Sequence, residues 1–151
     1  MSFEEQINPL FQIDEETWLN ALPQYQQKRI KQLLESSDSY EDAAKKWLSA
    51  IPENTFPFGA EKGKSVFFEK VRAEVEKFLC GDPTYEKERR ELVSATEVIH
   101  TTLVSSLSLA IAPVIGTASA YVTPVIVLIF MTMGKISLNA WCQMRMERKE
   151  G

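Results

Sequence analysis

Residues 98–134 read VIHTTLVSSLSLAIAPVIGTASAYVTPVIVLIFMTMG, and none of them is Asp, Glu, Lys or Arg. Because 25% of the whole chain is charged, such a run indicates a segment shielded from water. A single bilayer crossing takes about 20 residues, so the run is too long for one crossing. Pro113, Gly116 and Pro124 interrupt it near the middle. We therefore predict two helices that fold back on each other around Gly116 to Tyr121, as a hydrophobic hairpin.

The first helix of this hairpin is predicted to begin at Pro83 and to become apolar near Val98. Its part from Val98 to Ile115 would be roughly 27 Å long, close to the hydrocarbon thickness of a bilayer. One narrow face carries small and hydroxylated residues, which let helices approach closely inside a membrane. The predicted face for helix contacts or a pore consists of Thr101, Ser105, Ser108 and Ala112.

The second helix is predicted to run from Thr123 or Pro124 to about Met146. Its part from Val125 to Met131 is apolar on every side, which requires burial in lipid or in protein. Lys135 follows, and it would hold a functional position if the membrane enclosed it. Lys135 and the hydroxyls of the first helix suit a buried core or a subunit interface as well as they suit lipid, so both alternatives stay open.

Aromatic and basic residues flank the predicted hairpin. Trp141 lies where an aromatic residue of a membrane interface would lie, and bases occur on the outer side of both helices. The N-terminus lacks the basic and apolar regions of a secretory signal. We therefore expect an inner-membrane protein facing the cytoplasm, or a cytoplasmic protein before insertion. The flanking bases are Lys87, Arg89, Arg90, Arg145, Arg148 and Lys149.

Four short amphipathic helices are predicted before the hairpin, at about residues 14–22, 23–36, 39–51 and 65–80. Asp14 and Ser39 are the predicted N-caps of the first and third helices, and Asp42 follows Ser39 at capping-box spacing. Gly81 is the predicted C-cap of the fourth helix. Asp82 and Pro83 then begin a new helix.

The spacing of apolar residues also predicts which side chains of these helices face water. In the second helix we expect Ile30, Leu33 and Leu34 to be buried, and Gln26 to be exposed with its neighbours Gln27, Lys28 and Lys31. In the fourth helix we expect the charged residues, Glu74 among them, to lie mostly outside.

The predicted fold class is therefore all-α: a bundle of short amphipathic helices followed by a long hydrophobic helical hairpin. Residues 1–97 form the predicted cytosolic regulatory region, 98–146 the hairpin and 147–151 a charged tail. Residues 1–27 contain no Lys or Arg. We expect residues 1–80 to receive a protein partner, while the hairpin contacts membrane lipid or further copies of the chain.

Several classes of function are disfavoured by composition. The chain has 21 acidic and 17 basic residues, which argues against a nucleic-acid partner. Cys80 and Cys142 are predicted to be separate buried thiols in a reducing compartment. His100 is the only histidine, so we predict no metal, no cofactor and no catalytic residue. An enzyme that pairs Arg89 with His100 across subunits is the hypothesis ranked last.

The hydrophobic pattern from Val98 to Cys142 resembles, in general plan, small bacterial membrane-perturbing effectors and helical pore-forming domains that hide an apolar hairpin. The resemblance implies a non-enzymatic effector or toxin of bacterial defence that oligomerises and permeabilises a membrane. The alternative is an all-α adaptor or regulatory subunit whose hairpin forms a homo-oligomeric core.

Overall fold

Helices make up the fold in the computed structural model, which describes residues 3–12, 16–49, 60–95, 97–133 and 137–150; these contain no strand. The all-α prediction is therefore confirmed for the described part of the chain. In order, the helices are α1 (Phe3–Ile7), the 3-10 helix η1 (Asn8–Gln12), α2 (Glu16–Leu19), α3 (Gln24–Glu35), α4 (Tyr40–Leu48), α5 (Ala60–Leu79), the 3-10 helix η3 (Pro83–Tyr85), α6 (Glu86–Ala95), α7 (His100–Ile115), α8 (Ser119–Met133) and α9 (Leu138–Glu150).

Local capping signals set several of these boundaries as predicted. The Ser39 hydroxyl accepts a hydrogen bond from the Asp42 backbone N–H at 3.0 Å and so caps α4. Gly81, in the left-handed region at φ 87°, follows α5 and reverses the chain direction. Asp82 accepts from the Thr84 backbone N–H at 2.9 Å, and Pro83 occupies the first position of η3. Asp14, the other predicted cap, lies outside the described residues.

The predicted helix from Pro83 to Ile115 is wrong as one continuous element. It is divided into η3, α6 and α7, and Ile99 is extended, with φ −122° and ψ 173°. The Thr102 hydroxyl lies 2.9 Å from the Ile99 backbone N–H and 3.0 Å from the Ile99 carbonyl oxygen. A hydroxyl that bonds the backbone locally competes with helical hydrogen bonds and favours a helix start at this point.

The second predicted helix also has different limits. It begins at Ser119 rather than at Thr123 or Pro124, so Pro124 lies inside α8, and it ends at Met133 before α9 begins at Leu138. Lys135 lies outside the described residues. Gly116 closes α7 at φ 92°. Its backbone N–H donates to the Ala112 carbonyl as in an αL cap, and the Thr117 N–H donates to the same carbonyl as in a Schellman motif.

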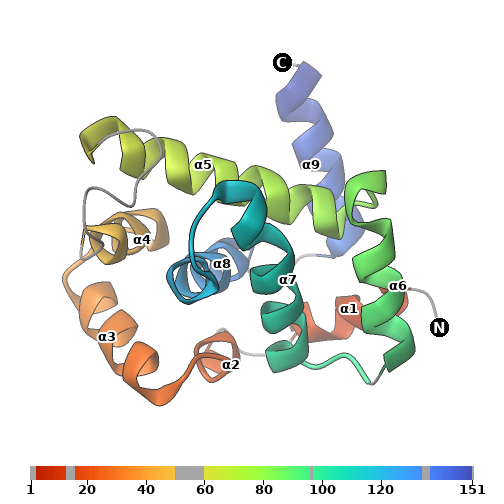
Figure 1. Cartoon of the computed structure of the whole chain (residues 1–151), viewed down its shortest axis with the longest axis horizontal. Helices are drawn as coiled ribbons and strands as arrows, with labels where there is room; N and C mark the ends of the chain where they lie inside the picture. Colours follow the sequence, from red (N-terminus) through yellow and green to blue (C-terminus); the bar gives the residue numbers. More distant parts are fainter. Residues whose placement is uncertain (1–2, 13–15, 50–59, 96, 134–136, 151) are drawn as a thin grey trace.

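Helix α8 lies at the centre of the molecule. It packs against α7, α4, α5 and α2, and Figure 1 shows it nearly end-on with the other helices around it. Every residue from Pro124 to Met131 is buried, so the helix has no exposed side over this length. The residues from Val125 to Met131, which were predicted to need burial on all sides, are therefore covered by α7 and by the amphipathic helices of the same chain.

Helices α7 and α8, which we call the α7–α8 pair, are the most apolar consecutive elements. The chain turns by 118° between them, and within the described residues no single helix is both long and apolar enough for a membrane span. The pair passes that test of length and composition only when its two helices are taken together.

Candidate functional site

The four residues of the predicted small-residue face of α7 do not share one environment. Thr101 and Ser105 are exposed, whereas Ser108 and Ala112 are buried against the core. The face therefore lies along the edge of the contact with α8, and only its second half takes part in helix packing. Pro113, on the solvent side of α7, is exposed.

Ser108 and Thr123 connect the two helices of the α7–α8 pair. The Ser108 hydroxyl donates to the Val104 carbonyl at 2.8 Å within α7. The Thr123 hydroxyl oxygen lies 2.8 Å from the Ser108 oxygen and 2.8 Å from the Ser119 carbonyl oxygen, so its single proton has an acceptor on either helix. The polar groups of this contact are thus satisfied inside an apolar interface.

Pro124 creates a special demand inside α8. Any other residue at position 124 would donate its backbone N–H to the Ala120 carbonyl, but proline has no N–H. Instead, the side-chain amide of Gln26 on α3 donates to the Ala120 oxygen at 3.1 Å. Beside it, the Trp47 indole of α4 donates to the Tyr121 carbonyl at 3.0 Å. Two helices of the N-terminal region therefore bind the exposed carbonyls of the first turns of α8.

These contacts correct the expected exposure of two polar side chains. Gln26 is buried rather than exposed, because it supplies the donor that Pro124 lacks, although its own carbonyl oxygen has no partner. Glu74 on α5 is buried too, because the Tyr85 hydroxyl donates to it at 2.7 Å and Lys77 pairs with it at 3.1 Å. Burial and this carboxylate raise the pKa of the Tyr85 hydroxyl far above its usual value.

An aromatic cluster covers the C-terminal half of α8. Trp18 of α2 lies 4.6 Å from the Phe130 ring, and Phe11 of η1 lies 5.7 Å from it, between ring centroids. Trp18 also meets the His100 ring edge to face at 4.4 Å. These four residues, Phe11, Trp18, His100 and Phe130, join the N-terminal segment to both helices of the α7–α8 pair.

Burial disfavours the charged form of His100 within this cluster. Its Nε2 lies 3.1 Å from the Leu10 carbonyl oxygen, so Nε2 carries the hydrogen of this bond. Burial lowers the pKa of His100, and the bond to Leu10 acts less strongly in the opposite direction. Protonation would therefore place a poorly solvated charge at the junction of η1, α2 and α7.

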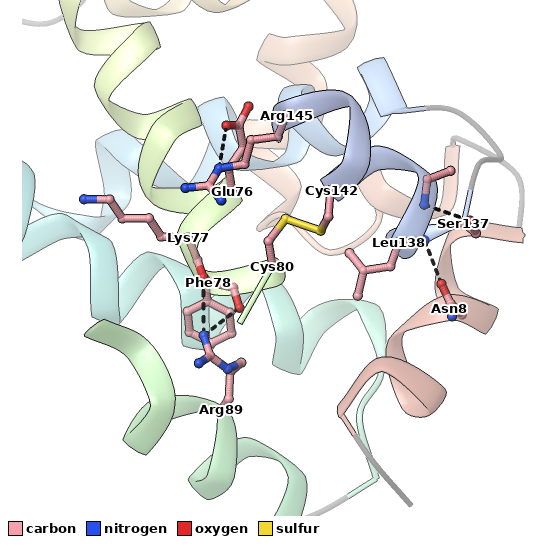
Figure 2. The surroundings of a disulfide bond; sticks show 11 residues. Asn8, Glu76, Lys77, Phe78, Cys80, Arg89, Ser137, Leu138, Cys142 and Arg145 are labelled. Carbon is pink, nitrogen blue, oxygen red and sulfur yellow. Dashed lines mark hydrogen bonds and ion pairs between the residues drawn. A yellow bond between two sulfur atoms is a disulfide. The ribbon is translucent and has the colours of Figure 1, made fainter. Parts of the chain in front are cut away.

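The C-terminal helix is bound to α5 by a disulfide, and the prediction of two separate thiols is wrong. Cys80 and Cys142 are bonded, with their Cα atoms 5.6 Å apart although 62 positions separate them in the sequence (Figure 2). Arg145 Nε forms an ion pair with Glu76 at 3.2 Å, although no acceptor lies in line with its N–H. Asn8 accepts a hydrogen bond from the Leu138 backbone N–H at 2.8 Å.

Trp141, predicted to lie at a membrane interface, is buried in this contact between α9 and the bundle. It lines a groove with Met133, Met144 and Phe68. Arg89, the other half of the proposed catalytic pair, donates to the Phe78 carbonyl at 3.0 Å and to the Asp82 carbonyl at 2.7 Å. It therefore caps the end of α5, and burial lowers its pKa.

A groove of about 480 Å³ lies between α6 and α7. Glu88, Glu91 and Leu92 form its α6 side, and Thr102, Ser106 and Leu109 line its α7 side. The Glu88 Oε2 atom is buried without a hydrogen-bond partner. Leu109 is 69% exposed and Val114 58% exposed, so the outer side of α7 presents apolar groups to solvent without any charge of its own.

The described residues contain no grouping that could hold a metal ion. No three His, Cys, Asp or Glu side chains gather there as a metal site would require. No family model, curated protein or solved structure matches this chain. The α7–α8 pair and the contacts that cover it are thus the candidate functional site.

Sequence reasoning missed the side chains that hold α8 and α9 in place. Gln26, Trp47 and Asn8 bond backbone groups of distant segments, and such pairings have no local signature. Pro124 was the one signal in the sequence that could have indicated a side-chain donor from another segment. A proline inside a helix leaves the carbonyl four residues before it without its usual backbone donor.

Proposed function

We propose that this chain is a non-enzymatic protein that perturbs membranes by inserting the α7–α8 pair as a hydrophobic hairpin. The observation that supports this most is that α8 is apolar on every side and is covered by α7 and by amphipathic helices of its own chain. A helix that is hydrophobic all round is at home either in a protein core or in lipid. The same sequence can therefore adopt two states: a folded state in which other helices cover α8, and a lipid-bound state in which the α7–α8 pair is inserted.

The lengths of the two helices favour partial insertion. At 1.5 Å per residue, α7 with 16 residues and α8 with 15 residues are roughly 24 Å and 22 Å long. The hydrocarbon core is about 30 Å thick. A pair of this size suits a hairpin that enters from one side and thins the bilayer around it. Amphipathic helices such as α4, once separated from α8, suit the membrane surface.

Opening requires the contacts around α8 to weaken. Two features respond to solution conditions: His100 in the aromatic cluster, and the disulfide between Cys80 and Cys142, which closes the loop that contains α7 and α8. Acid favours the opened state, because His100 regains its ordinary pKa there and binds a proton. A dithiol cleaves the disulfide and frees the ends of the loop. We therefore expect insertion at pH 5.5, increased by reduction, and little at neutral pH in the oxidised state.

Dye leakage from vesicles tests the proposal with a matched pair of variants. Leu109 and Tyr25 are each 69% exposed, so Leu109→Lys and Tyr25→Lys perturb the folded protein equally little. Only position 109 lies within the hairpin, where a Lys costs about 2.5–3.5 kcal/mol at the membrane centre. We expect Leu109→Lys to lower leakage on the order of a hundredfold and Tyr25→Lys to leave it unchanged.

Vesicles of phosphatidylcholine with an anionic phospholipid are the appropriate probe, at pH 7.5 and 5.5, with and without prior reduction of the protein by dithiothreitol at pH 7.5. Equal leakage by the two variants would show that α7 does not enter the lipid. Absence of leakage by the unaltered chain in all four conditions would refute the proposal.

A second candidate function is self-association through the outer side of α7. The exposed Leu109 and Val114, on a helix without a charged residue, favour it, because large exposed apolar groups mark contact surfaces. It predicts a discrete oligomer in light scattering without lipid, which Leu109→Lys dissociates and Tyr25→Lys does not. A monomer at all concentrations would exclude it.

A further inference from the structure

The disulfide closes a covalent loop around the central part of the fold. Cys80 follows the last residue of α5, and Cys142 lies in the first turns of α9. The two cysteines are 62 positions apart in the sequence, and the segment between them contains η3, α6, α7 and α8. One covalent bond therefore ties the segment after α8 to the segment before α6.

Besides the disulfide, the described contacts of α9 with the bundle lie mostly in its first turns, where the Leu138 backbone N–H also donates to Asn8 at 2.8 Å. Leu138 and Trp141 are buried in its first turns, and Arg145 pairs with Glu76 beyond them. Met144 and Met146 are exposed, and Figure 1 shows the C-terminal end of α9 projecting away from the other helices. The helix is peripheral, so its position depends strongly on the disulfide.

The disulfide can be reached from solvent. Cys80 and Cys142 are half-buried and line a groove of about 330 Å³ together with Phe3 and Asn139. Gly81, beside Cys80, is exposed, and no heavy atom lies within 4 Å of the place where a side chain would start. An attacking thiolate needs such open access to one of the two sulfurs.

We propose that Cys80–Cys142 is a thiol–disulfide exchange site for a dithiol reductant, and that its reduction releases α9 from α5. A thiolate of the reductant attacks one sulfur, the S–S bond breaks, and the other cysteine leaves as a thiolate that takes up a proton. The second thiol of the reductant then displaces the remaining cysteine. Two electrons and two protons pass to this chain, and the reductant becomes a disulfide.

Reduction would also expose the apolar side of α9 and the surface beneath it. Leu138 and Trp141 lose their cover, while the contacts of α3 and α4 with α8 remain in place. This release goes beyond the proposed insertion in lipid and does not depend on it, because it takes place in the protein without a membrane.

Hydrogen exchange of the full chain tests the release, with dithiothreitol as the dithiol. We expect amides of α9 to exchange at least about tenfold faster after reduction, as for a locally opened helix, while those of α8 stay protected. The Cys80→Ser/Cys142→Ser variant should match the reduced protein and show no response to dithiothreitol. Unchanged protection of α9 after reduction would overturn the proposal.

The rate of reduction provides an independent measurement. For an exchange site, dithiothreitol should reduce the folded protein within about tenfold of the rate found in urea. Reduction only at the much slower rate of global unfolding would show a purely structural disulfide and refute the exchange site. Neither experiment contains lipid, so a failure here is distinct from a failure of the leakage assay.

Discussion

The bond from Gln26 to Ala120 offers the sharpest test of how the N-terminal helices hold α8. We interpret Gln26 as the replacement donor for the N–H that Pro124 lacks. Gln26→Leu keeps the apolar stem and removes this donor. Because the Ala120 residue is exposed and the bond is only part-buried, losing the bond costs about 0.5–1.5 kcal/mol. Loss of the unpartnered Gln26 carbonyl oxygen offsets part of that cost, so the single variant alone is ambiguous.

A double-mutant cycle with Pro124→Ala resolves the ambiguity. Alanine restores a backbone N–H at position 124, which can satisfy the Ala120 carbonyl within α8. Gln26→Leu should therefore destabilise the Pro124→Ala background less than the natural one, with a coupling energy of about 1 kcal/mol between the two positions.

Urea denaturation followed by circular dichroism measures the four unfolding free energies of this cycle. In thermal scans the coupling corresponds to roughly 2–4 °C for a chain of this size. Gln27→Leu, at the neighbouring half-buried position, is the control, because its side chain bonds the Leu22 carbonyl instead. Equal costs of Gln26→Leu in both backgrounds would refute the interpretation.

Three further predictions concern stability. Cys80→Ser/Cys142→Ser should lower the unfolding free energy by about 4 kcal/mol from the loop-closure entropy of 62 positions, and an unchanged urea midpoint would contradict it. His100 has a lowered pKa in the folded protein, so the unfolded chain binds more protons as pH falls below 6.5. Stability should then fall by at most about 1.4 kcal/mol per pH unit, and a His100→Gln variant with the same slope between pH 7.5 and 5.5 would exclude this cause. Tyr85→Phe removes the donor to the buried Glu74 and should cost about 1–3 kcal/mol in urea denaturation; no loss would show that Lys77 alone satisfies the carboxylate.

Periodic and capping patterns predicted the helical class and several boundaries correctly. Ser39, Gly81 and Pro83 act through their immediate neighbours, so the sequence around them was sufficient. The absence of charge from 98–134 likewise predicted that α8 is shielded from water. It did not predict whether lipid or protein shields the helix, because both impose the same apolar pattern.

Contacts between distant segments were beyond the reach of these patterns. Gln26 reads as a surface residue from its periodicity, and only the proximity of α3 to Pro124 makes it a buried donor. Cys80 and Cys142 carry no spacing motif, and they meet because α5 and α9 lie side by side. The predicted division into residues 1–97, 98–146 and 147–151 stays a prediction.

Resistance of vesicle-bound protein to a carbonate wash tests most directly whether the α7–α8 pair enters lipid. The purified chain is reduced with dithiothreitol at pH 7.5, then brought to pH 5.5 in the presence of vesicles, washed with carbonate and separated by flotation. Insertion predicts that the unaltered chain and Tyr25→Lys float with the lipid, whereas Leu109→Lys is largely released. Complete recovery of the unaltered chain in the wash would contradict insertion and leave α8 as the core helix of a protein that acts away from lipid.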